Sequence, residues 1–163
     1  MPMHDIHADQ PTHANPRSTA AIGGHPIHPM LVPFPIVCFA GTLLADIMLV
    51  STGGPGWATA SYWLLAVGLG VAALAAVAGF ADFFGDPLVR GHSDAVKHMA
   101  ANLTLVVLEA MNLLLRRDNP GFIASTGVYL SAVAVLIMLH SGWKGGELVF
   151  RHGVGVLTAH RRE

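Results

Sequence analysis

Four long apolar stretches, separated by short turns, dominate the pattern of hydrophobic and polar positions along the chain. They cover residues 31–50, 57–81, 96–115 and 121–142. A helix needs roughly 20 apolar residues to cross the ~30 Å hydrocarbon core of a membrane, and each stretch reaches about this length. The third stretch also carries polar residues. Its place between strong spans favours a membrane helix that faces a bundle interior over an amphipathic surface helix.

The segments between these stretches contain turn-forming residues. Residues 51–56 read STGGPG, residues 116–121 read RRDNPG, and Gly145-Gly146 is expected to end the fourth helix. We therefore predict an all-α fold, a four-helix transmembrane bundle over residues 24–157. Residues 1–23 lack the apolar run of a signal peptide, so they are expected to form a flexible polar arm, and residues 158–163 a short tail.

Basic residues favour one side of this bundle. Those on the side of the termini are Arg17, Arg90, Lys97, Lys144, Arg151, Arg161 and Arg162. The other side holds only Arg116 and Arg117. Because basic loops stay in the cytoplasm, we expect a multi-pass protein of the bacterial inner membrane with both termini cytoplasmic.

Composition narrows the function classes. Of the 163 residues, 53% are hydrophobic and 12% are charged, and the formal net charge is -1 at pH 7. These values exclude a disordered chain and a basic surface that binds nucleic acid. The single cysteine, Cys38, excludes an intrachain disulfide. The 10 histidines are the feature that composition leaves to be explained.

One face of the third predicted helix is polar. His98, Asn102, Leu105, Glu109 and Asn112 follow one another at intervals of four, three, four and three residues, which places them on one face. Polar groups buried in a membrane need partners. We therefore expect Asn102 and Asn112 to form hydrogen bonds between helices, and Glu109 to need Asn112, Asp46 or a water as partner.

The first and second helices offer surfaces that complement this face. Asp46, near the end of the first helix, is expected at the same depth as Glu109 and is one candidate partner. The second helix carries a face of small residues that ends in an acid: Gly68, Ala72, Ala75, Gly79 and Asp82. Small residues let another helix approach closely, so this face is expected to be a packing surface.

Several histidines are expected at the cytoplasmic end of the bundle. Two of His28, His98 and His140 are candidate axial ligands of a b-type haem, because imidazole ligates haem and helix bundles host such sites. A divalent metal held by His25, His28 and His152 is the less favoured alternative. Neither a Cys-x-x-Cys-His nor a His-Glu-x-x-His motif is present. The competing interpretation is that each histidine caps a helix end or bonds a backbone carbonyl.

Two motifs, together with His98-x-x-x-Asn102, resemble a known family. They are GHPIHPMLVPFPI at residues 24–36 and GGELVFRHGVG at residues 145–155. They resemble the bacterial membrane family called domain of unknown function 2231. The resemblance implies four membrane helices and a redox setting, since relatives are sometimes joined to Rieske-type iron–sulfur domains. Some relatives have His in place of Pro33 and Tyr in place of Phe150.

The second motif also suggests contacts at the rim of the bundle. If Gly145-Gly146 lets the chain fold back, Glu147, Arg151 and His152 are expected to meet the first motif. They would then form either a ligand-binding rim or a latch that joins the first and fourth helices.

Three hypotheses for function follow. The leading one is a redox-linked module, either a small b-type cytochrome or an accessory subunit of a respiratory complex. The alternatives are a purely structural or interaction subunit, and a protein that handles a divalent metal or protons around Asp46 and Glu109. The expected partners are the lipid bilayer and either a second copy or subunits of a redox complex, with no nucleic acid. No hydrolase or transferase motif is found.

Overall fold

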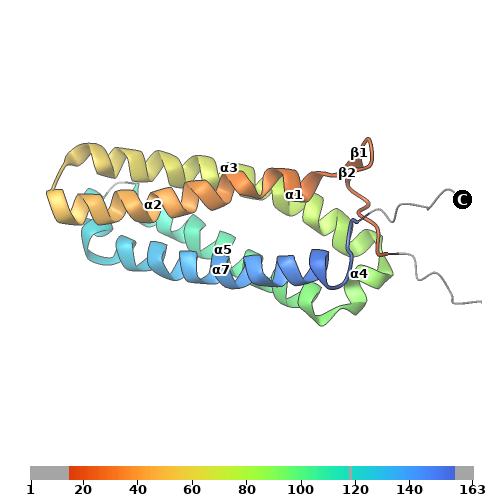
Figure 1. The fold of residues 1–163 in the computed structure, drawn as a ribbon. Coiled ribbons are helices and arrows are strands. Elements are labelled where there is room, and N and C mark those ends of the chain that lie inside the picture. Colours follow the sequence, from red (N-terminus) through yellow and green to blue (C-terminus); the bar gives the residue numbers. More distant parts are fainter. Residues whose placement is uncertain (1–14, 118, 157–163) are drawn as a thin grey trace, which may run out of the picture.

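Helices make up almost all of the computed structural model, which describes residues 15–117 and 119–156. The four long helices are α2 (Pro33–Thr52), α3 (Pro55–Gly85), α5 (Ser93–Arg116) and α7 (Val128–Phe150). The short elements are β1 (Ala21–Ile22), β2 (His25–Pro26), α1 (Ile27–Leu31), α4 (Pro87–Gly91), α6 (Pro120–Phe122) and the π-helical turn η1 (Ile123–Gly127). The long helices lie side by side, and β1, β2 and α4 lie together at one end of the bundle (Figure 1).

Four helical stretches are long and apolar enough to cross a membrane. They are Ile27–Thr52, Pro55–Gly85, Ser93–Arg116 and Ile123–Phe150, with mean hydropathies of 2.0, 2.3, 1.4 and 1.8. Large apolar side chains such as Val77 and Leu114 point outward and are 69% and 70% exposed. Exposed apolar surface of this kind is typical of contact with lipid. The predicted all-α bundle of four membrane helices is therefore confirmed.

The helices pair as two hairpins, α2 with α3 and α5 with α7. Gly68 on α3 lets the first hairpin close tightly, because a Cβ atom there would lie 2.8 Å from Cβ of Cys38 and 2.9 Å from Cε1 of Phe39. The buried apolar core draws on all four long helices and contains Phe39, Leu65, Ala72, Leu105, Ala134 and Met138.

The fourth long helix does not end at Gly145-Gly146, as the sequence had suggested, but continues to Phe150. Glycine inside a helix is destabilising by roughly 0.5–1 kcal/mol relative to alanine, so its presence needs a reason. The reason at Gly145 is a close contact, since a Cβ atom there would lie 2.9 Å from Cε1 of His98. The glycine makes room for an imidazole rather than for a turn.

Part of the predicted flexible arm is bonded to the bundle. At the end of α3, Oδ1 of Asp82 accepts hydrogen bonds from the backbone N–H of Ala20 and the hydroxyl of Ser18, both at 2.8 Å. The backbone N–H of Gly155 donates to the carbonyl of Pro16 at 2.9 Å. These bonds attach residues 16–20 of the expected arm to the bundle. Residues 1–14 and the predicted tail lie outside the described residues.

Candidate functional site

Two histidines from different hairpins meet inside one end of the bundle. His28 belongs to α1 and His98 to α5, and their ring centroids lie 6.0 Å apart with the ring planes at 89°. Nδ1 of His28 donates to the carbonyl of Ala75 at 2.8 Å, and Nδ1 of His98 donates to the carbonyl of Ser141 at 2.8 Å. Because a carbonyl can only accept, both bonds place a proton on Nδ1.

Glycines let both rings lie close to a helix backbone. A Cβ atom at Gly79 would lie 3.0 Å from Nδ1 of His28, and one at Gly145 would lie 2.9 Å from Cε1 of His98. Each glycine is four residues beyond the carbonyl that binds the ring. The small-residue face predicted on the second helix therefore forms the surface against which the His28 ring packs.

The two imidazoles differ at their second nitrogen. Nε2 of His98 accepts a hydrogen bond from the amide of Asn102 at 3.0 Å, within the same helix. Both nitrogens of His98 thus have partners. No hydrogen bond to Nε2 of His28 is found among the described residues. Nε2 of His28 is therefore the ring nitrogen of this pair that remains available to a ligand.

The other predicted histidine ligands lie elsewhere. His140 is exposed on α7, and His25 is exposed with Nδ1 3.1 Å from the carbonyl of Gly23. His152 stacks on His92 at a centroid distance of 4.1 Å and contacts Asp94 at 3.3 Å. Over residues 15–117 and 119–156, no three His, Cys, Asp or Glu side chains are placed to hold a metal. Of the sequence candidates, the structure brings together only His28 and His98.

A second polar site lies in the bundle nearer the opposite end, around an ion pair. The guanidinium of Arg116 binds both carboxylate oxygens of Asp46, at 3.1 and 3.2 Å, and both side chains are fully buried. Ser61 and Ser131 each contact both charged residues, with the Ser131 hydroxyl 2.7 Å from Oδ2 of Asp46. Asn112 completes the set, its carbonyl oxygen accepting from Arg116 at 2.7 Å. All four long helices contribute to this polar cluster.

Glu109 lies beside the polar cluster and is also fully buried. Its Oε2 accepts from the amide of Asn112 at 2.8 Å, whereas its Oε1 has no partner in the described part of the chain. Of the partners weighed from the sequence, Asn112 is therefore the one that bonds Glu109. Asp46, another of the expected partners, instead bonds Arg116.

Arg116 was expected in a loop outside the bundle, but it lies in the buried polar cluster. It is the next step along the polar face of α5, four residues after Asn112. Its position directly before Arg117 and a turn concealed that role, because two adjacent arginines are typical of a loop. Continuing the helical spacing by one more step would have found it.

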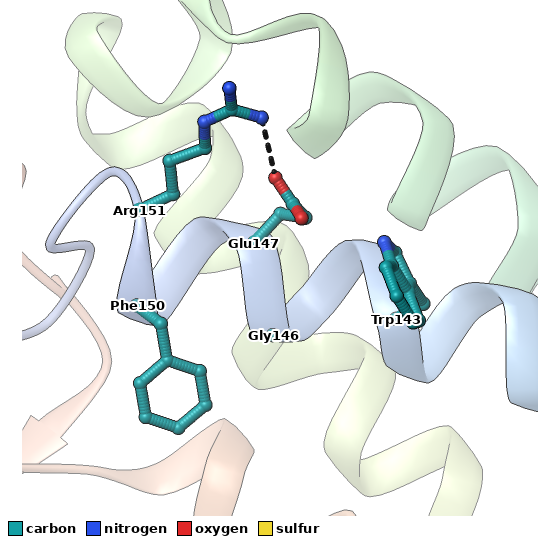
Figure 2. Close-up of a pocket in the computed structure, with 5 residues that line it drawn as sticks. All are labelled: Trp143, Gly146, Glu147, Phe150 and Arg151. Carbon is teal, nitrogen blue, oxygen red and sulfur yellow. Dashed lines mark hydrogen bonds and ion pairs between the residues drawn. The ribbon is translucent and has the colours of Figure 1, made fainter.

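The rim formed by the second motif joins different helices from those expected. Arg151 pairs with Glu147 at 3.0 Å, one turn earlier on α7 (Figure 2). Lys144 pairs with Asp94 at 3.0 Å, and His152 contacts the same carboxylate, so the latch joins α7 to α5 rather than to the first helix. Trp143 and Phe150 flank a shallow groove on the outer face of α7 and are 70% and 92% exposed.

Comparison with known proteins agrees with this architecture. The model of the family described as "Predicted membrane protein (DUF2231)" matches residues 24–158, which include all four long helices and both motifs. No curated protein and no solved structure matches the chain. By this match over most of its length, the chain belongs to the DUF2231 family of predicted membrane proteins.

Proposed function

We propose that the protein is a redox-linked membrane subunit that holds a b-type haem between His28 and His98. The observation that carries the proposal is the pair of imidazoles from opposite hairpins, each oriented through Nδ1 by a backbone carbonyl. Such a bond is the usual support of a ligating histidine and presents Nε2 to the metal. Two imidazoles with metal–nitrogen bonds of ~2 Å have ring centres about 6 Å apart, close to the 6.0 Å found here.

Haem binding at this pair requires that an existing hydrogen bond to His98 be replaced by a bond to iron. The amide of Asn102 now occupies Nε2 of His98, so it must give up that hydrogen bond for the iron. Once bound, haem iron would carry one electron at a time inside the bilayer. His140, exposed on α7, takes no part in this proposal.

We place the protein in the bacterial inner membrane with the histidine pair near the cytoplasmic side. The charge asymmetry supports this orientation more strongly once the burial of Arg116 is taken into account. Of the two basic residues assigned to the opposite side, Arg116 is buried and only Arg117 is exposed, whereas Arg17, Arg90, Lys97 and Arg151 are exposed among the described residues on the side of the termini. The proposed partners are other subunits of an electron-transfer complex.

A structural or interaction subunit is the second candidate. The polar cluster favours it, because Asp46, Ser61, Asn112, Arg116 and Ser131 satisfy one another across all four long helices. That arrangement fixes helix packing without any ligand. Under this alternative, replacing His98 would change thermal stability and no spectrum.

A visible spectrum with metal analysis tests the haem proposal. Protein purified in detergent from cells supplied with a haem precursor should show a Soret band and about one iron per chain. His28→Ala and His98→Ala should each abolish the band, whereas the exposed His140→Ala should keep it. A colourless wild type that binds no added haem refutes the proposal, and so does a divalent metal bound in place of haem.

A further inference from the structure

Most buried positions of the first hairpin recur in the second, although the counterpart of the buried Ala45, Leu115, is exposed. The buried residues Pro35, Phe39, Thr42 and Asp46 of α2 correspond to Leu105, Glu109, Asn112 and Arg116 of α5, each 70 positions later. The second helices of the two hairpins, α3 and α7, correspond at a spacing of 66 positions. From Ser61 to Ala75 and from Gly127 to Ser141, the order of buried, half-buried and exposed positions is identical.

The histidine contacts repeat with these two spacings. His28 bonds the carbonyl of Ala75 and lies on Gly79. The residue 70 positions after His28 is His98, which bonds the carbonyl of Ser141 and lies on Gly145. Ser141 and Gly145 follow Ala75 and Gly79 by 66 positions. One arrangement of ring, carbonyl and glycine therefore occurs once in each hairpin.

The sequence at the start of α3 also recurs at the start of the last helical segment, but at a spacing one position shorter. Residues 55–57 read Pro-Gly-Trp and residues 120–122 read Pro-Gly-Phe, at a spacing of 65 positions. The π-helical turn η1 follows the second of these. A π turn accommodates one extra residue in a helix, which accounts for the change of spacing from 65 to 66.

We infer that the membrane domain is two fused copies of one helical hairpin, which pair about a pseudo-twofold axis parallel to the helices. Such an axis exchanges α2 with α5 and α3 with α7. It also relates the α2–α7 interface to the α3–α5 interface, and both are present. The inner face of each hairpin is thus an interaction surface whose partner is a second hairpin of the same design. This inference needs no cofactor and goes beyond the proposed function.

Asp46 and Arg116 occupy equivalent positions in the two copies and carry opposite charges. Two like hairpins would bring two acids or two bases together at the axis, which is strongly unfavourable in a membrane interior. The opposite charges of Asp46 and Arg116 therefore favour pairing of the first hairpin with the second over pairing of two identical hairpins. Ser61 and Ser131 each bond both charged side chains, but they are not equivalent positions, because the spacing of 66 pairs Ser61 with Gly127 and Leu65 with Ser131.

A charge exchange in the full chain tests the inference. Asp46→Arg and Arg116→Asp, made singly, should each lower Tm strongly, because each brings two like charges together in the buried cluster. The fourfold variant D46R/R116D/T42N/N112T also exchanges the residues one turn before the charges, and it should regain at least half of the lost thermal stability. Without an axis, α2 and α5 are not interchangeable, and an arginine at position 46 would not reach an aspartate at position 116 in the way that Arg116 now reaches Asp46. A fourfold variant as unstable as the single reversals overturns the inference.

Matched glycine variants give a second test that does not require a large rearrangement. Gly79→Ala and Gly145→Ala crowd equivalent rings, so they should lower Tm by amounts that agree within about twofold. Gly142→Ala, where a Cβ atom meets nothing within 4 Å, is the control and should leave Tm unchanged or raise it slightly, because alanine favours a helix more than glycine does. Losses that differ by more than this factor would show that the two contacts are not equivalent. Because Tm is read without haem, neither test depends on the proposed function.

Discussion

At the scale of single residues, the arginine at the end of α5 has the largest expected effect on stability, because its charge is buried. Arg116 is 2% exposed, and its guanidinium is satisfied by Asp46 and three uncharged side chains. Breaking a buried ion pair by removing one partner typically costs 3–5 kcal/mol, since the other charge stays buried and unpaired. Replacing both partners by apolar residues removes that penalty.

Arg116→Met should therefore destabilise the protein by about 3–5 kcal/mol. The double variant Asp46→Leu with Arg116→Met should recover most of this loss. Reversible unfolding in detergent or lipid would give both values. Arg117→Met, which changes the exposed neighbouring arginine, is the matched control and should have little effect. A double variant no more stable than Arg116→Met would contradict the account.

The polar face of α5 could be predicted from the sequence, but the residues that bind it on other helices could not. The spacing from His98 to Asn112 placed those residues on one face, because helix periodicity is local. The pairing of Arg116 with Asp46 joins residues 70 positions apart, and no local pattern reveals such a contact. The same limit applies to the histidines. The sequence placed several near one end, but only the packing of α1 on α3 and α5 on α7 decides which rings meet.

At the scale of elements, glycines set how closely the helices approach. The four membrane helices could be predicted because their length and apolar composition are constrained by the bilayer. Their ends could not be predicted as well. Gly53, with φ of +69°, ends α2, whereas Gly145 lies inside α7. The difference depends on what faces the glycine, which the sequence does not state.

Gly68→Ala should destabilise the first hairpin by about 1–3 kcal/mol, because the added methyl would overlap Cys38 and Phe39. Gly70→Ala is the control on the same helix, since a Cβ atom there meets nothing within 4 Å. Thermal unfolding followed by circular dichroism measures both. Equal stability of the two variants would show that α2 and α3 can separate at no cost.

At the scale of the whole molecule, the four long helices place the β1–β2 end and the α2–α3 turn at opposite ends of the bundle (Figure 1). The proposed orientation assigns the first of these ends to the cytoplasm. In a Cys38→Ser background, Thr52→Cys should react with a membrane-impermeant maleimide in intact spheroplasts. Arg90→Cys should react only after lysis. The reverse labelling pattern would invert the proposed topology.

The ion pair between Asp46 and Arg116 also bears on how the protein is made. A charged side chain in a membrane helix is costly to insert without a partner, although less so near a helix end, where Arg116 lies, than at the centre. Asp46 and Ser61 lie on helices that leave the ribosome before α5 does, so the acceptors for Arg116 are already in the bilayer when it arrives. The third span can therefore enter the bilayer beside a first hairpin that already presents an acidic and a hydroxyl partner for its arginine.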